Sequence, residues 1–126
     1  MTHAIALTIT LIRHGQTVWN ILNKLQGQCN SPLTEKGIEE AQKTHRIIHK
    51  EHYDAIYCSD LGRAKQTAHY ALSADQYAEV IFSGYLRERS FGDFGGMLRS
   101  DLKKNTQDFN NLYYNNTYIP PNGESI

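Results

Sequence analysis

The chain has 126 residues, enough for one hydrophobic core, and its 13 basic residues balance its 13 acidic residues. A formal net charge of zero gives nucleic acid or an acidic membrane surface nothing to attract, so a cationic site must be local. The apolar N-terminal run is too short to span a bilayer and has neither a basic leader nor a cleavage signal. We therefore expect a cytoplasmic protein with no nucleic-acid or membrane partner.

Residues 4–12 alternate between large apolar and small or hydroxyl side chains, the period-two pattern of a β-strand. Arg13, His14 and Gly15 follow directly, and Thr17 can cap a short helix. Gly15 permits a tight turn and a close approach of the backbone to a ligand. A strand, a polar turn and a helix start make an anion site, and a neutral imidazole beside it has a lone pair for nucleophilic attack.

Thr34 is the expected N-cap of a helix over residues 35–52. One face of that helix is predicted to pack on a sheet, and it carries Ile38, Ala41, His45, Ile48 and His52. The spacing of His45, His49 and His52 could hold a metal, because residues three and four apart on a helix are neighbours. The alternative is that two of them border the buried stripe and the third is solvated. No carboxylate or cysteine shares that face at this spacing, so we expect no metal.

Residues 53–58 predict a second strand, and a polar turn with Ser59 or Asp60 as the cap starts the next helix. Arg63 lies in the first turn of that helix. Because the carboxyl ends of parallel strands meet at one edge of a sheet, Arg63 is expected near His14. A second guanidinium there suits a bound phosphate, whereas a solvated surface arginine is the alternative.

The two cysteines, Cys29 and Cys58, have no zinc-ligand spacing and are expected to be free thiols. Cys58 and Arg63 also resemble the two ends of a cysteine phosphatase loop. The interval between them is one residue short of that loop, and a cysteine nucleophile would leave His14 without a role. We therefore favour the histidine.

Residues 79–82 predict a third strand, which leads into a loop rich in glycine and phenylalanine over residues 84–96. Glu88 lies between Arg87 and Arg89, whose charges would hold it ionised if it were exposed. Burial near a phosphate would instead raise the pKa of Glu88 and let it carry a proton. An ion-paired surface glutamate is the alternative.

Four segments together resemble the histidine phosphatase superfamily, in the branch shared by cofactor-dependent phosphoglycerate mutases and fructose-2,6-bisphosphatase-like phosphatases: residues 11–20, 26–37, 59–68 and 86–96. The resemblance implies an α/β fold with a mostly parallel sheet and helices on both faces. It implies that His14 takes the phosphoryl group, that Arg13 and Arg63 clamp its oxygens, and that Glu88 protonates the leaving oxygen. The residues implied on the substrate side are Asn20 and Gly27. No cofactor or metal is implied.

The residues around Glu88 are similar to the phosphatase branch, with Arg87 before it and Ser90 and Phe91 after it. Mutases typically have asparagine before the glutamate and a histidine-tyrosine pair after it. The resemblance therefore implies a phosphatase with water as the acceptor and a small phosphorylated metabolite, such as a sugar phosphate, as the substrate. Two alternatives stay open. One is mutase-type phosphoryl transfer with a bisphosphorylated cofactor, and the other is a non-catalytic remnant that binds phosphate esters or a partner.

Residues 98–109 predict a helix, followed by a loop rich in asparagine and tyrosine. In the family, the segment that residues 120–125 resemble precedes a long helix and a strand that ends in a second pocket histidine. Since the chain ends at Ile126, the resemblance implies a single domain over residues 1–126, the N-terminal two thirds of the family domain. Loss of one donor to the phosphoryl oxygens costs on the order of a hundredfold in rate. The strand of residues 4–12 would also have an unpaired edge.

Overall fold

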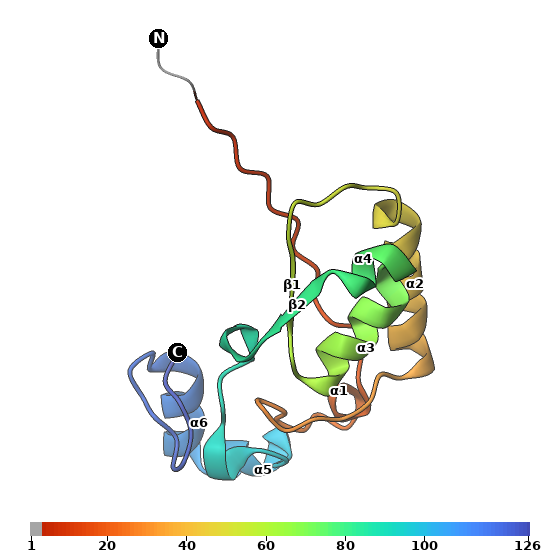
Figure 1. Cartoon of the computed structure of the whole chain (residues 1–126). Coiled ribbons are helices and arrows are strands. Elements are labelled where there is room, and N and C mark those ends of the chain that lie inside the picture. The colour runs from red at the N-terminus through yellow and green to blue at the C-terminus, as the bar shows by residue number, and fades with distance from the viewer. Residues whose placement is uncertain (1–3) are drawn as a thin grey trace.

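The computed structural model describes residues 4–126 and contains a parallel two-stranded sheet, with β1 (Ile56–Ser59) beside β2 (Val80–Ser83) (Figure 1). The register pairs Ile56 with Val80 and Ser59 with Ser83. Two helices, α3 (Gly62–Ala71) and α4 (Ala74–Ala78), connect the strands. A parallel pair needs such a helical crossover, so the α/β class with a parallel sheet is confirmed. No helix within residues 4–126 is long and apolar enough to cross a membrane.

The predicted strand over residues 4–12 is wrong, because this segment is extended but belongs to no sheet. In Figure 1 it runs away from the body of the molecule as the red end of the ribbon. Its apolar side chains are exposed, with Ile5 at 96% and Leu11 at 89%. A strand needs a neighbour to pair its backbone N–H and C=O groups, and no described segment pairs with this one. Alternation in the sequence predicts the side-chain pattern but cannot supply the neighbour.

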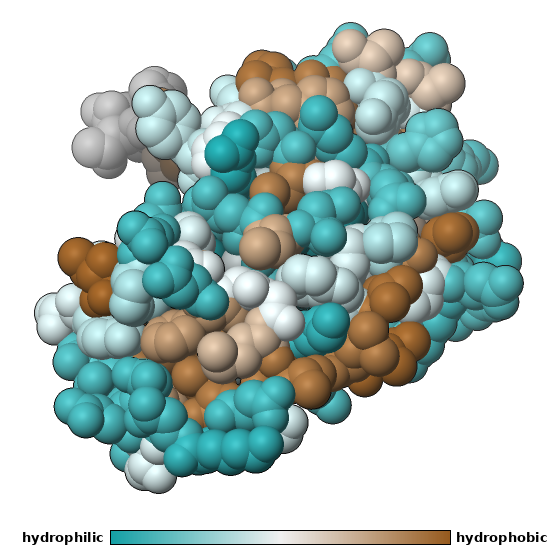
Figure 2. Space-filling model, turned by 90° about the horizontal axis from the view of Figure 1, so that it is seen from below, coloured by the Kyte–Doolittle hydropathy of each residue, from teal (hydrophilic) through white to brown (hydrophobic). Residues whose placement is uncertain are grey.

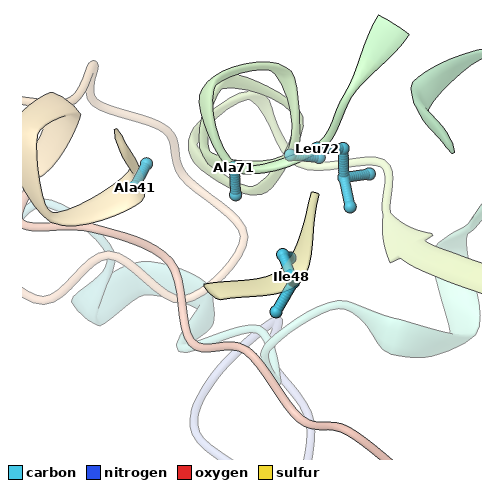
Figure 3. Packing of buried hydrophobic residues seen from close by; sticks show 5 residues of the cluster. Ala41, Ile48, Ala71 and Leu72 are labelled. Carbon is cyan, nitrogen blue, oxygen red and sulfur yellow. The ribbon is translucent and has the colours of Figure 1, made fainter. Parts of the chain in front are cut away.

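A first hydrophobic cluster lies between α2 (Glu35–Ile48) and α3, and side chains of the sheet pack against it (Figure 3). Its buried members are Ala41, Ile48, Ala68, Ala71 and Leu72. The apolar face of α2 is therefore buried as predicted, but it packs mainly on α3. The helix also ends earlier than predicted, because Gln76 Nε2 donates to the carbonyls of Ile48 (2.9 Å) and Glu51 (3.0 Å). His52 lies beyond the helix end and is exposed.

A second hydrophobic cluster is built around α5 (Arg99–Lys104) and α6 (Thr106–Tyr114) and contains Leu25, Phe94, Leu102 and Leu112. The single helix predicted over residues 98–109 is broken at Asn105, whose side chain accepts from the backbone N–H of Asp108 and caps α6. The stretch predicted as a loop continues α6 instead, because Leu112 is completely buried in this cluster.

Three short elements complete the fold: α1 (Val18–Ile21), η1 (Gly84–Leu86) and η2 (Gly92–Phe94). On the sheet face opposite the first cluster, Tyr57 and Ile81 are exposed at 62% and 50%. Figure 2 shows apolar side chains gathered in a band across the face seen from below. Apolar surface thus remains uncovered on the described part of the chain.

Candidate active site

The loop after the extended segment carries His14 and is held close to α2. A Cβ on Gly15 would overlap the carbonyl of Gly37, so only glycine permits this approach. The N–H of Gly15 donates to Thr67 Oγ1 (3.0 Å), and the N–H of Gln16 donates to Glu40 Oε2 (2.9 Å). The backbone around the predicted nucleophile is therefore fixed by contacts with both α2 and α3.

His14 is half-buried, and its Nδ1 lies 2.8 Å from the carbonyl oxygen of Gly15. Because a carbonyl can only accept a hydrogen bond, this contact favours the tautomer with the proton on Nδ1, which leaves the lone pair on Nε2. Burial is the largest effect and lowers the pKa of His14. The hydrogen bond with the Gly15 carbonyl opposes it, the positive charges of Arg63 and Arg13 lower the pKa further, and Glu88 raises it. A lowered pKa keeps the imidazole neutral near pH 7, as a nucleophile requires.

Arg63 lies in the first turn of α3, as predicted, and is only 3% exposed. Its guanidinium donates from Nη1 to the carbonyl of Cys29 (2.8 Å) and from Nη2 to the carbonyl of Gly27 (2.7 Å). The alternative of a solvated surface arginine is therefore wrong. Burial lowers the pKa of Arg63, which nevertheless stays charged because guanidinium pKa values are so high.

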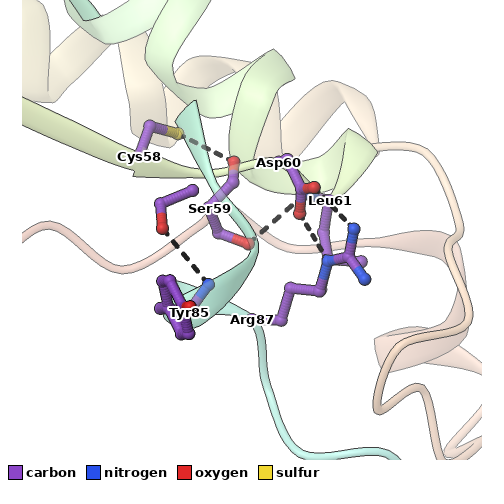
Figure 4. A network of polar contacts seen from close by, with 7 residues as sticks. Cys58, Ser59, Asp60, Leu61, Tyr85 and Arg87 are labelled. Atoms are coloured by element: carbon purple, nitrogen blue, oxygen red, sulfur yellow. Dashed lines mark hydrogen bonds and ion pairs between the residues drawn. The ribbon is translucent and has the colours of Figure 1, made fainter. Parts of the chain in front are cut away.

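The predicted cap of α3 is also wrong. The N-cap position is Leu61, which makes no side-chain cap hydrogen bond, and Asn30 Oδ1 instead accepts from the N–H of Arg63 (2.9 Å). Asp60 is engaged elsewhere, in a bidentate pair with Arg87 (Figure 4). Asn30 is distant in sequence, and no local signal marks it as the cap.

The two residues implied on the substrate side, Asn20 and Gly27, both make structural contacts. Gly27 has a φ of +52°, and its carbonyl orients Arg63. The side-chain oxygen of Asn20 accepts from the N–H of Thr17 (2.9 Å) in a capping box at the start of α1. Asn20 is exposed, so its amide group is accessible from solvent.

The Glu88 loop is held by its two arginines, but neither pairs with Glu88. Arg87 donates from Nε and Nη2 to the two carboxylate oxygens of Asp60, each at 2.6 Å (Figure 4). Arg89 Nη2 donates to the carbonyl of Leu112 (2.7 Å). The ion-paired alternative for Glu88 is therefore wrong, and so is its expected burial, because the side chain is exposed. Its Oε1 accepts only from the N–H of Arg89 (3.0 Å) among the described hydrogen bonds.

The other sites considered from the sequence do not assemble. Burial raises the pKa of the Cys58 thiol, and its Sγ lies 3.2 Å from the carbonyl of Ser59, so Cys58 is a poor candidate for a thiolate nucleophile. The rings of His45 and His49 stack 4.8 Å apart, with Nδ1 atoms directed at backbone carbonyls. His52, beyond the helix, does not join them.

A surface hollow of about 440 Å³ lies beside the Glu88 loop and is lined by Gln28, Phe82, Ser83, Gly84, Tyr85, Arg87 and Glu124. The carboxylate of Glu124 connects two loops beside the hollow, because it accepts from Gln28 Nε2 (3.1 Å) and from the N–H of Ser90 (2.9 Å). The hollow does not include His14.

His14 is influenced by the charges of Arg63, Arg13 and Glu88. A neutral histidine with two arginines and a carboxylate nearby defines a candidate site for phosphoryl transfer to histidine. The chain belongs to the histidine phosphatase superfamily (branch 1), whose family model matches residues 9–126. The resemblance deduced from the sequence is thus confirmed.

Relatives of this chain have names of both phosphatases and mutases. It is 37% identical over 122 residues to the adenosylcobalamin/alpha-ribazole phosphatase of Escherichia coli (strain K12), covering 95% of this chain and 60% of the relative. It is 35% identical over 125 residues to a 2,3-bisphosphoglycerate-dependent phosphoglycerate mutase of Bartonella bacilliformis, covering 94% of this chain and 61% of the relative.

The fold is similar to that of a mycobacterial glucosyl-3-phosphoglycerate phosphatase in complex with VO3. The TM-score is 0.78 at 29% sequence identity, covering 89% of this chain and 56% of that chain. The chain thus spans about three fifths of the length of the curated relatives described above.

Proposed function

We propose that this chain hydrolyses a small phosphate ester, such as a sugar phosphate, through a phosphohistidine intermediate on His14. The observation that carries the proposal is the imidazole of His14, with Nδ1 facing the Gly15 carbonyl at 2.8 Å and its pKa lowered by burial and by Arg63. The free Nε2 lone pair would attack phosphorus as the bond from phosphorus to the ester oxygen breaks. Glu88 is exposed, so it would take up a proton when the negatively charged phosphate of the substrate lies beside it, and it would give that proton to the leaving oxygen.

The second half-reaction returns the enzyme to its starting state. Water attacks the phosphorus of phosphohistidine, Glu88 takes a proton from that water, and inorganic phosphate leaves as the bond from nitrogen to phosphorus breaks. Arg13 and Arg63 clamp the phosphoryl oxygens through both steps. A guanidinium has more N–H donors than the two bonds of Arg63 to carbonyls use, so donors remain for phosphate.

Hydrolysis is favoured over mutase-type transfer by the residues around Glu88. Arg87 occupies the position before it and is fixed by Asp60, while Ser90 and Phe91 follow it. Asn20 and Gly27 lie on the substrate side in this proposal. The named phosphatases among the relatives support the same assignment, and a small phosphorylated metabolite is the substrate class.

The test is phosphate release from a panel of small phosphate esters, with acid-labile phosphohistidine trapped by rapid quench. His14→Ala should abolish both signals. His52→Ala is the matched control, because His52 is exposed and outside the site. Phosphate transfer to a monophosphoglycerate instead of water would establish the mutase. Binding of phosphate esters without turnover between about pH 5 and 8 would instead establish a non-catalytic binding protein.

A further inference from the structure

Two polar side chains outside the proposed phosphate clamp hold the backbone on either side of Gly15. Thr67, only 5% exposed, accepts from the N–H of Gly15 at 3.0 Å and donates its own hydroxyl hydrogen to the carbonyl of Arg63 at 2.8 Å. Glu40 accepts from the N–H of Gln16 at 2.9 Å through Oε2. The peptide before Gly15 is thus held by α3, and the peptide after it by α2.

The peptide held by Glu40 is the one whose carbonyl faces the nucleophile. The C=O of Gly15 and the N–H of Gln16 belong to one peptide group, and Nδ1 of His14 lies 2.8 Å from that carbonyl oxygen. A carboxylate that accepts from the N–H end polarises the peptide and makes its oxygen a stronger acceptor. A stronger acceptor favours the proton on Nδ1 and makes Nε2 more basic.

We propose that Glu40 is a positioning residue that acts on His14 through the peptide between Gly15 and Gln16, with Thr67 fixing the preceding peptide. The carboxylate of Glu40 and the imidazole of His14 thus interact through the peptide group that lies between them, and not by a direct hydrogen bond. It depends on the close packing of Gly37 against Gln16, since a Cβ on Gly37 would overlap the carbonyl of Gln16. Glu40 lies one helical turn after Gly37 and reaches the loop because of that approach.

This proposal rests on the proposed role of His14, so its first readout needs no turnover. Imidazole ¹⁵N NMR reports which nitrogen of His14 carries the proton. Glu40→Leu should remove the preference for Nδ1–H, whereas Glu40→Gln, which keeps an acceptor oxygen, should retain much of it. Glu39→Leu, on the exposed neighbour in α2, is the matched control and should leave the His14 signals unchanged.

The second readout is the rate of phosphohistidine formation at saturating ester. Glu40→Leu should slow it about tenfold, the equivalent of one hydrogen bond to a charged group, with little change in KM. Thr67→Val should slow it similarly, and Thr67→Ser should restore it because the hydroxyl is kept. Urea unfolding of each variant separates this effect from loss of fold.

Unchanged tautomer populations in folded Glu40→Leu would overturn the proposal, whether or not the parent chain turns over. If the parent forms no phosphohistidine while the tautomer shifts as expected, the proposed function fails and the positioning role stands. A tautomer shift in Glu39→Leu equal to that in Glu40→Leu would also overturn the role of Glu40, because the effect would then be a general one of charge on α2.

Discussion

Arg63→Lys tests how much of the site depends on a guanidinium fork as opposed to a positive charge. The parent side chain bonds two backbone carbonyls at once, those of Gly27 and Cys29, at 2.7 and 2.8 Å. A lysine ammonium is a single nitrogen on a flexible stem and cannot reproduce that spacing. The variant keeps the charge and leaves at least one carbonyl without its donor.

The magnitude follows from the burial of the two acceptors. The Gly27 carbonyl bond is fully buried, whereas the Cys29 bond is only partly buried. Leaving a buried acceptor unsatisfied costs about 1–3 kcal/mol, and we expect the free energy of unfolding to fall by that amount. The loss should lie toward the upper end if the lysine bonds Cys29, because the fully buried carbonyl of Gly27 is then the one without a donor. With a urea m-value of about 1–3 kcal/mol/M, the unfolding midpoint should fall by roughly 1 M.

The assay is equilibrium urea unfolding followed by circular dichroism, together with titration of orthovanadate against the folded variant. Vanadate affinity should fall as well, because the fork no longer presents its remaining donors to the anion in a fixed geometry. Arg46→Lys is the control, since Arg46 is exposed on α2 and its replacement should change neither quantity. An Arg63→Lys midpoint and vanadate affinity equal to those of the parent would refute the reasoning.

Three further outcomes are expected. Asp60→Asn should leave the urea midpoint nearly unchanged, because its ion pair with Arg87 is exposed to solvent, yet it should lower kcat by loosening the Glu88 loop. A large fall in the midpoint with full kcat would contradict this. The pKa of His14 in the folded chain lies below the unfolded value near 6.5, so the fold favours the neutral imidazole. The stability that His14 contributes is therefore present above pH 6.5 and is lost as the pH falls through the folded pKa. Urea midpoints should therefore drop more for the parent than for His14→Ala between about pH 8 and 5, and an equal drop would count against it. In hydrogen exchange, the amides of residues 5–12 should exchange at nearly unprotected rates while those of α2 and α3 are slow; protection of residues 5–12 would reveal a pairing segment.

Features that depend only on neighbouring residues in the sequence, such as helix N-caps, could be predicted. Thr34 does cap α2, since its side chain accepts from the N–H of Gly37, and Thr17 caps α1. The proximity of His14 and Arg63 was expected from a rule about parallel strands, and both residues do lie within electrostatic reach of each other. Because the strand before His14 does not form, the loop is held in place instead by the hydrogen bonds of Gly15 to Thr67 and of Gln16 to Glu40.

Features that depend on distant partners could not be predicted. The arginines beside Glu88 looked like its ion-pair partners, but Asp60 and the Leu112 carbonyl, far away in sequence, take them instead. The alternation in residues 4–12 gave no information on pairing, which requires a second segment. Glu40 appeared to be one of several charged residues on α2 until Gly37 brought that helix onto the loop.

The residues of the proposed site are attached to two different hydrophobic clusters. Arg63 belongs to a helix of the first cluster, whereas Arg89, next to Glu88, is anchored to Leu112 in the second. Sub-global opening of α5 and α6 would release the proton donor, whereas the loop around His14 would stay bonded to α2 and α3, and Arg63 to the carbonyls of Gly27 and Cys29. A partly unfolded chain would therefore retain anion affinity after losing turnover, so thermal inactivation should precede the loss of vanadate binding.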